Sequence, residues 1–131
     1  MLKVDIVSPI GLVDSLEVDS LTVKLTSGYR TILGGHTPLI GVLDYASMHV
    51  VKDGKTEYYA IHGGALNITK EKATLIVNGV EHESKIDVNR SNESLKRAKD
   101  RLSHKDEDID IKRAELSLKR ALARISAFNR E

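Results

Sequence analysis

The sequence predicts a β plus α protein, in which an N-terminal antiparallel β-sandwich or flattened barrel of short strands precedes a C-terminal two-helix hairpin. Apolar residues alternate with polar ones from residue 3 to about residue 80, which is the period of half-buried strands. After Ile86 they recur every three or four residues, as in a helix, and neither glycine nor proline occurs again. These two periods predict a sandwich domain at 1–84 and a helical domain at 85–131.

Turn-forming stretches separate the predicted strands. They read "SPIG", "TSG", "GGHTP", "KDGK", "HGG" and "VNG", and the segments between them are too short for helices. The stretch "KDGKTEYY" predicts a hairpin with Asp53 and Gly54 in its turn, because these residue types adopt the positive φ angles of a tight turn. Many short strands folded as a sandwich or flattened barrel is the simplest architecture that fits.

Each predicted helix carries an apolar stripe. The first stripe comprises Val88, Ser91, Leu95, Ala98 and Leu102, and the second comprises Ile111, Ala114, Leu118, Ala121, Leu122, Ile125 and Phe128. The polar run "SHKDEDID" separates them and predicts a short turn. Two helices alone bury little apolar surface, so they need to dock on the sandwich or on a partner, and such a pair is a candidate movable element.

Composition excludes several classes of function. A net charge of +1 gives no field that selects nucleic acid or an acidic membrane surface. The chain has no cysteine, and no apolar stretch long enough to cross a membrane or to serve as an export signal, so we expect a soluble protein without direct membrane insertion. Walker-type, HExxH and Gly-x-Ser-x-Gly motifs are absent and the five histidines are scattered, so we expect neither an enzyme nor a metal site.

Asp87 stands immediately before the first helical stripe and has two interpretations. An aspartate at this position is a preferred helix N-cap, which stabilises a helix by about 1 kcal/mol. Arg90 and Arg97 each have an acidic residue three or four positions away, so both also fit a solvated helix face. The alternative is that Asp87 and these arginines form part of a ligand site.

The second predicted helix has two arginines without a helical partner. Lys112, Arg113 and Lys119 each have an acidic residue three or four positions before them, at Asp108, Asp110 and Glu115, whereas Arg120 and Arg124 have none. In an antiparallel hairpin Arg90 and Arg97 confront this pair, so four arginines converge. We expect negative charge from outside the helix, either an acidic protein surface or a phosphate group, which guanidinium groups bind through paired hydrogen bonds.

The order of three segments resembles a known family. The stretches "GYRTILGGHTPLIGVL" (28–43) and "IHGGALNITKEKATLIVNGVEHESKID" (61–87), followed by a helical hairpin, look like the epsilon subunit of the bacterial F-type ATP synthase. The match covers nearly the whole chain. Its most specific parts are Gly35, His36, Pro38 and Leu39, and the Gly-Gly of "IHGG".

The resemblance implies a non-catalytic rotor subunit of the central stalk in a complex that couples proton transport to ATP synthesis. By this resemblance the sandwich holds the gamma subunit and rests on the membrane ring, with Arg30 and His36 near the ring. The other interpretation of His36 is a turn histidine that is hydrogen-bonded to local backbone. The helices reach the alpha and beta subunits and inhibit hydrolysis when extended, and the protein lies peripherally on the cytoplasmic face of the bacterial cell membrane.

The resemblance also implies ATP as a regulatory ligand that is bound without hydrolysis and without a metal that the sequence requires. Some bacterial members bind ATP at the folded hairpin through Ile/Leu-Asp-x-x-Arg-Ala, which here reads from Ile86 to Ser91, with serine in place of the usual alanine. The remaining residues of that site fall on Glu81, Arg97, Arg120 and Arg124, so the implied set is Glu81, Ile86, Asp87, Arg90, Arg97, Arg120 and Arg124.

Two other functions remain open at this point. The first is a free-standing nucleotide-binding regulator, which co-purification with gamma would distinguish from a rotor subunit. The second is an enzyme that uses Asp87 and Glu81 as acid and base, and absence of nucleotide turnover would count against it.

Overall fold

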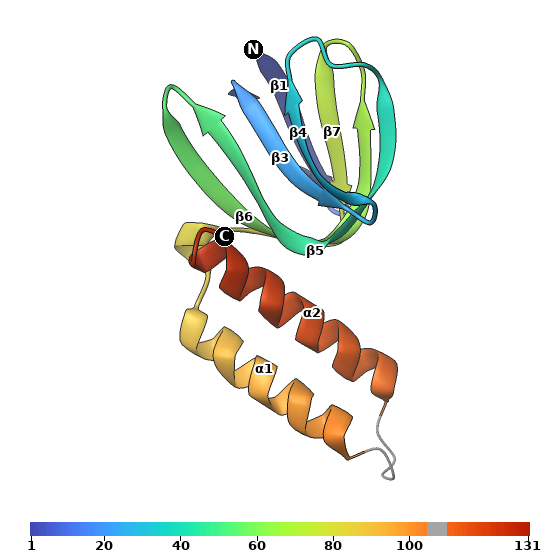
Figure 1. The fold of residues 1–131 in the computed structure, drawn as a ribbon, viewed down its shortest axis with the longest axis vertical. Coiled ribbons are helices and arrows are strands. Elements are labelled where there is room, and N and C mark those ends of the chain that lie inside the picture. The colour runs from blue at the N-terminus through green and yellow to red at the C-terminus, as the bar shows by residue number, and fades with distance from the viewer. Residues whose placement is uncertain (105–109) are drawn as a thin grey trace.

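The computed structural model describes residues 1–104 and 110–131 as one folded sheet and a helical hairpin, of which the second helix packs on the outside of the sheet (Figure 1). The strands are β1 (Leu2–Ser8), β2 (Gly11–Val18), β3 (Ser20–Leu25), β4 (Gly28–Leu33), β5 (Leu39–Lys52), β6 (Lys55–Ile68), β7 (Lys72–Val77) and β8 (Val80–His82). A short 3-10 turn, η1 (Glu83–Lys85), leads into α1 (Val88–Ser103) and then α2 (Ile111–Phe128).

The sheet has the order β2-β1-β7-β6-β5-β3-β4, with β8 paired to β6. It does not close into a barrel, because β2 and β4 remain its two edges. Strands β5 and β6 run for 14 residues each and bend, so the two halves of the sheet face one another (Figure 1). The predicted sandwich of mainly antiparallel strands is confirmed, with one difference: β1 and β7 pair in parallel.

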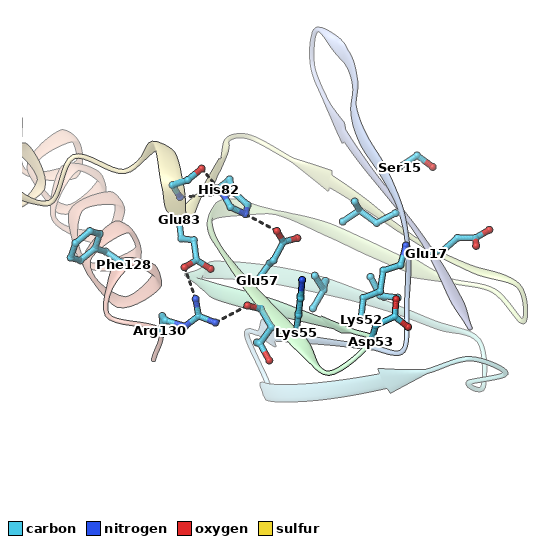
Figure 2. A pocket seen from close by; sticks show the side chains of 15 residues that line it. Ser15, Glu17, Lys52, Asp53, Lys55, Glu57, His82, Glu83, Phe128 and Arg130 are labelled. Atoms are coloured by element: carbon cyan, nitrogen blue, oxygen red, sulfur yellow. Dashed lines mark hydrogen bonds and ion pairs between the residues drawn. The ribbon is translucent and has the colours of Figure 1, made fainter.

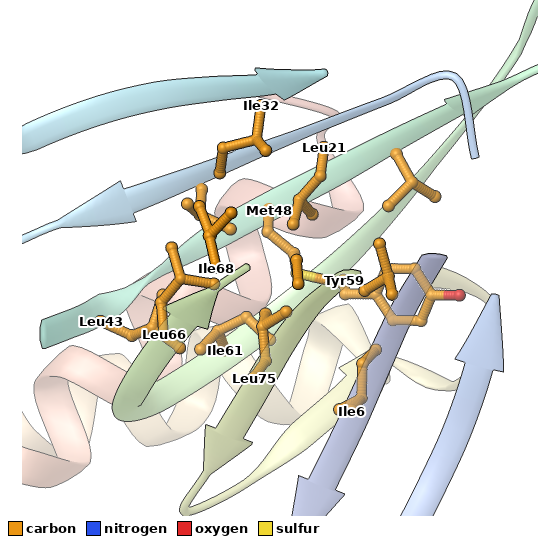
Figure 3. Close-up of a cluster of buried hydrophobic side chains, with 14 of the residues drawn as sticks. Ile6, Leu21, Ile32, Leu43, Met48, Tyr59, Ile61, Leu66, Ile68 and Leu75 are labelled. Atoms are coloured by element: carbon orange, nitrogen blue, oxygen red, sulfur yellow. The ribbon is translucent and has the colours of Figure 1, made fainter. Parts of the chain in front are cut away.

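The inward side chains of both halves form one apolar core (Figure 3). Ile6, Leu21, Leu66 and Leu75 are fully buried there, together with Met48. The alternation of the sequence selects these residues, because successive side chains of a strand point to opposite faces of the sheet. The core therefore lies entirely within the first 84 residues, and the helices add only a small second cluster.

The predicted hairpin around "KDGKTEYY" is confirmed. Strands β5 and β6 pair in register from Val51 opposite Thr56 to Lys52 opposite Lys55, which leaves a two-residue turn. Asp53 has φ 51° and Gly54 has φ 77°, the two positive angles of a type I′ turn.

The predicted helical hairpin is also confirmed, with α2 lying between the sandwich and α1 (Figure 1). Asp87 caps α1 by accepting a hydrogen bond from the Arg90 backbone N–H at 3.1 Å, and Asp110 caps α2 in the same way. Residues 105–109 of the predicted turn "SHKDEDID", and with them the predicted pairing of Lys112 with Asp108, lie outside the described residues.

Candidate functional site

A hollow between the two helices is lined by guanidinium groups. Its volume is about 300 Å³, and it lies between one flank of α1 and one flank of α2. Arg97 and Arg101 project from α1, while Arg120 and Arg124 project from α2. The residues of each pair are four apart, so both side chains emerge on the same side of their helix. Ser94, Ala98 and Ser117 complete the wall, and we call this space the arginine hollow.

The arginine hollow has an excess of positive charge. None of the acidic side chains that the structure describes lines it. Within residues 1–104 and 110–131, Arg97, Arg101 and Arg120 have no carboxylate within ion-pair distance. The Arg97 Nη2 donates to the Ser94 hydroxyl at 3.2 Å. Because like charges repel in so small a space, an anion placed between them lowers the energy of the cluster.

A second hollow of about 290 Å³ adjoins the first, because Arg120 and Arg124 line both. Its other walls belong to the sandwich, including Tyr45 of β5, His62 of β6 and Glu81 of β8. Tyr45 and His62 are paired across β5 and β6. This space, the junction hollow, therefore lies where the hairpin meets the sandwich.

Glu81 connects the two domains at the junction hollow. Its Oε1 accepts hydrogen bonds from Arg124 Nε at 2.6 Å and from His62 Nε2 at 3.2 Å. Burial alone raises the pKa of Glu81, but the bonds from Arg124 and His62 lower it below its usual value. We expected negative charge from outside the second helix, and the Glu81 carboxylate of the sandwich supplies part of it.

The predicted residues Ile86, Asp87 and Arg90 lie at the start of the hairpin. Ile86 is buried with Ala60, Ala123 and Ala127, so it belongs to the apolar contact between the domains. Asp87 is the N-cap already described. Arg90 is exposed and lines neither hollow, although its spacing of seven residues places it on the same flank of α1 as Arg97. The structure therefore brings Glu81, Arg97, Arg120 and Arg124 to the two adjoining hollows, with Arg90 two turns before Arg97.

Arg30 and His36 lie elsewhere, at the β4 edge of the sheet. Arg30 is an exposed residue of β4, and His36 follows that strand in the turn before β5. The ring Nδ1 of His36 lies 2.7 Å from the Thr37 carbonyl oxygen, and the His36 backbone N–H donates to Leu33. His36 therefore makes the local backbone contacts of a turn histidine, and both side chains lie outside the arginine and junction hollows.

Two family models match consecutive parts of the chain. The beta-sandwich domain of the ATP synthase delta/epsilon chain matches residues 1–83, and the long alpha-helix domain of the same chain matches residues 84–129. The chain belongs to the epsilon-chain family of F-type ATP synthases. Among curated relatives, the epsilon chains of Bacillus mycoides (strain KBAB4) and Bacillus cereus (strain B4264) are each 37% identical to it over 102 residues, covering 78% of this chain and 77% of theirs.

Two solved structures share the epsilon-family fold. A chain of the Euglena gracilis mitochondrial ATP synthase superposes with a TM-score of 0.81 at 19% identity, covering 92% of this chain and 76% of that one. A chain from the central stalk and c-ring of the Tetrahymena thermophila enzyme superposes with a TM-score of 0.59 at 12% identity, covering 98% and 94%. At these identities the likeness is one of fold.

Several lining residues of this epsilon-family chain were not predicted from sequence. The spacing of Arg101 could have predicted it, because it follows Arg97 by four residues, just as Arg124 follows Arg120. No spacing in the sequence predicts Tyr45 or His62 as a site residue. They reach the junction hollow through the pairing of two long strands, and local spacing does not encode such a pairing.

A third and larger hollow, of about 910 Å³, lies beside the C-terminal end of α2 (Figure 2). Acidic and basic side chains both line it, among them Glu57, Lys55 and Arg130, and Phe128 lies at its edge. This mixture favours no single class of ligand. Among the described residues, no group of three or more histidine, aspartate or glutamate side chains is placed to hold a metal ion.

Proposed function

We propose that this chain is a non-catalytic subunit of the ATP synthase central stalk, which couples gamma to the membrane ring and regulates ATP hydrolysis through its helical hairpin. The family matches over residues 1–129 support the stalk role. The single observation that carries the regulatory role is the arginine hollow. We propose that ATP binds there as a regulatory ligand and holds the hairpin on the sandwich.

The chemistry of the arginine hollow fits a polyphosphate chain. Arg97, Arg101, Arg120 and Arg124 offer only hydrogen-bond donors, and guanidinium groups bind phosphate oxygens in pairs. Two serine hydroxyls add further donors. We assign Arg90 to the open end of this flank, where it meets the ligand after a change of rotamer. Glu81, Ile86 and Asp87 lie near the domain junction, where Glu81 positions Arg124. We assign all three residues to the nucleoside part of the ligand.

Binding without hydrolysis follows from the same residues. Hydrolysis of a phosphoanhydride requires a positioned water and, in most enzymes, a carboxylate-held magnesium ion. The arginine hollow supplies donors for the phosphates, and Glu81, the neighbouring carboxylate among the described residues, is occupied by Arg124 and His62. ATP therefore acts here as a bridge between the helices, and it shifts the population toward the compact form.

An exposed apolar row supports docking of gamma on the sandwich. The register of five adjacent strands aligns Leu12, Val7, Ile76, Ala65 and Val42 on the outer face of the sheet. Leu12, Ile76 and Val42 are each more than half exposed. A continuous apolar row of this kind is typical of a protein interface. We assign this apolar row to gamma, and we assign Arg30 and His36, at the β4 edge, to the membrane ring.

The contact between hairpin and sandwich supports a movable hairpin. Its fully buried side chains are small, namely Ala123 and Ala127 of α2 against Ala60 of β6, with Ile86 beside them, so the apolar burial of these alanines contributes little. Among the larger apolar residues of α2, Ile111, Leu122 and Phe128 stay nearly half exposed. We propose that residues 1–84 form the docking domain and that residues 85–131 form a regulatory domain, whose exposed side chains contact alpha and beta when it extends.

We propose a peripheral location for the complex-bound chain, on the cytoplasmic face of the bacterial cell membrane. Attachment through gamma and the ring provides the membrane association. Neither helix of the described residues is long and apolar enough to cross a bilayer.

Calorimetric titration of the isolated protein with ATP, ADP and GTP tests the ligand role. We expect one-to-one binding that prefers ATP, weakened roughly tenfold or more by Arg97→Gln or Arg90→Ala, since a charged hydrogen bond contributes about 1.5–3 kcal/mol. Arg113→Gln is the matched control, because Arg113 is an exposed arginine of α2 outside both hollows. No heat at millimolar ATP, or equal weakening by the control, would reject the nucleotide site and leave the family assignment intact.

A further inference from the structure

Arg130 ends α2 in a conformation that arginine rarely adopts. Its φ is 57°, in the left-handed region. The Glu131 N–H donates to the Ser126 carbonyl at 3.0 Å and the Arg130 N–H donates to the Ala127 carbonyl at 3.1 Å, so the last turn is a Schellman motif. Glycine is the usual residue at this position, because a side chain there has an unfavourable backbone energy. The sequence nevertheless places an arginine at this position.

The Arg130 side chain makes three contacts with the sandwich, and Figure 2 shows the two that are hydrogen bonds. Nη1 donates to Glu83 Oε1 at 2.6 Å, and Nη2 donates to the Thr56 carbonyl oxygen at 2.6 Å. The guanidinium carbon lies 5.0 Å from the centre of the Tyr58 ring, which is the geometry of a cation–π contact. All three partners precede residue 85, so each contact crosses the boundary between the proposed domains.

The acceptor for Arg130 is itself held in place. Glu83 Oε2 accepts a hydrogen bond from the Tyr58 backbone N–H at 2.7 Å, which fixes the carboxylate against β6. Arg130 therefore meets a preorganised partner, and its planar fork loses less freedom on binding than a flexible ammonium group does.

We propose that Arg130, Glu83, Thr56 and Tyr58 form a clasp that controls release of the hairpin from the sandwich, separately from the arginine hollow. The inference rests on the movable hairpin of the proposed function. The weak alanine contact leaves much of the docking free energy to polar contacts, and the clasp supplies three of them at the end of α2. The contacts of the Arg130 side chain in the docked state offset the unfavourable conformation of its backbone.

The clasp is testable by distance measurement, because the chain has no cysteine and introduced labels are unique. Spin labels at Lys70→Cys, between β6 and β7, and at Lys99→Cys, on α1, both occupy exposed positions. Docked and released hairpins give separate distance populations. With Arg130→Gln or Glu83→Gln we expect the ratio of released to docked molecules to rise about fivefold, an estimate reduced for the partial exposure of Arg130. Arg113→Gln is the control and should leave the ratio unchanged.

Arg130→Gly separates the clasp from the helix end. Glycine improves the Schellman turn but removes all three side-chain contacts. If the clasp controls release, Arg130→Gly releases the hairpin as Arg130→Gln does, and the double variant Arg130→Gln/Glu83→Gln adds little to either single one. If Arg130 only terminates the helix, Arg130→Gly leaves the hairpin more firmly docked, and the clasp is rejected.

The outcomes also distinguish the clasp from the movable hairpin. If ATP shifts the distance populations but the Arg130 and Glu83 variants do not, the clasp alone is wrong. If every variant shows only the docked distance, with and without ATP, the hairpin does not leave the sandwich, and both the movable hairpin and the clasp are wrong. Calorimetric binding of ATP would stand in either case.

Discussion

His62 is the buried titratable residue at the junction of the two domains. It is 5% exposed, and its Nδ1 has no hydrogen-bond partner among the described residues. Burial lowers the pKa of His62 below its ordinary value of 6.5, and Arg124 and Arg120 lower it further, whereas the bond to Glu81 raises it. Tyr45 is the remaining titratable group that lines the same hollow. The folded protein therefore disfavours the charged imidazole.

This lowered pKa predicts loss of stability in mild acid. As the pH falls below 6.5, the unfolded chain takes up a proton at His62 before the folded chain does, so the free energy of unfolding decreases. Urea unfolding between pH 7.5 and 5.5 measures this slope. We expect His62→Gln to reduce it, but not to zero, because burial also lowers the pKa of His49. An unchanged slope in His62→Gln would contradict the assignment.

Asp87 has two possible roles, helix N-cap and ligand contact, and two substitutions distinguish them. Its Oδ1 accepts from the Arg90 N–H, which confirms the N-cap. Asparagine caps a helix about as well as aspartate, whereas alanine loses about 1 kcal/mol. We expect Asp87→Ala to lower the free energy of unfolding by this amount and Asp87→Asn to leave it within a few tenths of a kcal/mol, as measured by urea denaturation. Weakened ATP binding in Asp87→Asn at unchanged stability would assign the carboxylate to the ligand, and unchanged binding would leave it as a cap.

At the scale of the element, α2 shows what the sequence predicts and what it does not. The helical period, the Asp87 N-cap and the presence of two helices follow from local spacing, whereas the Asp110 N-cap was not predicted. Local spacing does not predict which residues of α2 are buried, because that depends on both of its neighbours, α1 and the sandwich. The buried residues of α2 are alanines: Ala114 and Ala121 belong to the predicted stripe, whereas Ala123 and Ala127, in the cluster with Ile86, lie outside it. Ile111, Leu122 and Phe128 of the same stripe remain nearly half exposed.

The alanine contact predicts a strong effect of side-chain size at the domain junction. Ala127 is fully buried, so a leucine there has no room, and overpacking costs about 1–3 kcal/mol. Because the contact is small, we expect Ala127→Leu to release the hairpin rather than unfold the sandwich. Protease digestion should then cut the helices early and leave the sandwich intact. Leu122→Ala, at an exposed position of the same helix, is the control with little effect. Equal protease resistance in both variants would mean that the junction is more adaptable than its packing suggests.

At the scale of the whole molecule, the sheet topology brings together segments that no local pattern connects. The turns predicted from glycine and proline account for neighbouring strands, and the Asp53-Gly54 hairpin is one example. The parallel pairing of β1 with β7 joins residues nearly seventy positions apart, and nothing in the spacing of either strand encodes it. That pairing places Val7 beside Ile76 and makes the apolar row continuous. The junction hollow arises in the same way, from β5, β6, β8 and α2 together.

The apolar row gives the last prediction, on assembly. Ile76 is 53% exposed at the middle of the row, so Ile76→Lys leaves the core untouched, and we expect the free energy of unfolding to change by less than about 1 kcal/mol. A lysine in the centre of an apolar interface loses its hydration without gaining a partner, so binding to gamma should weaken by at least tenfold or so. Leu33→Lys is the matched control, because Leu33 is 57% exposed on β4, outside the row. Co-purification with gamma that survives Ile76→Lys but fails with Leu33→Lys would move the gamma surface to the β4 edge and assign the apolar row to another partner.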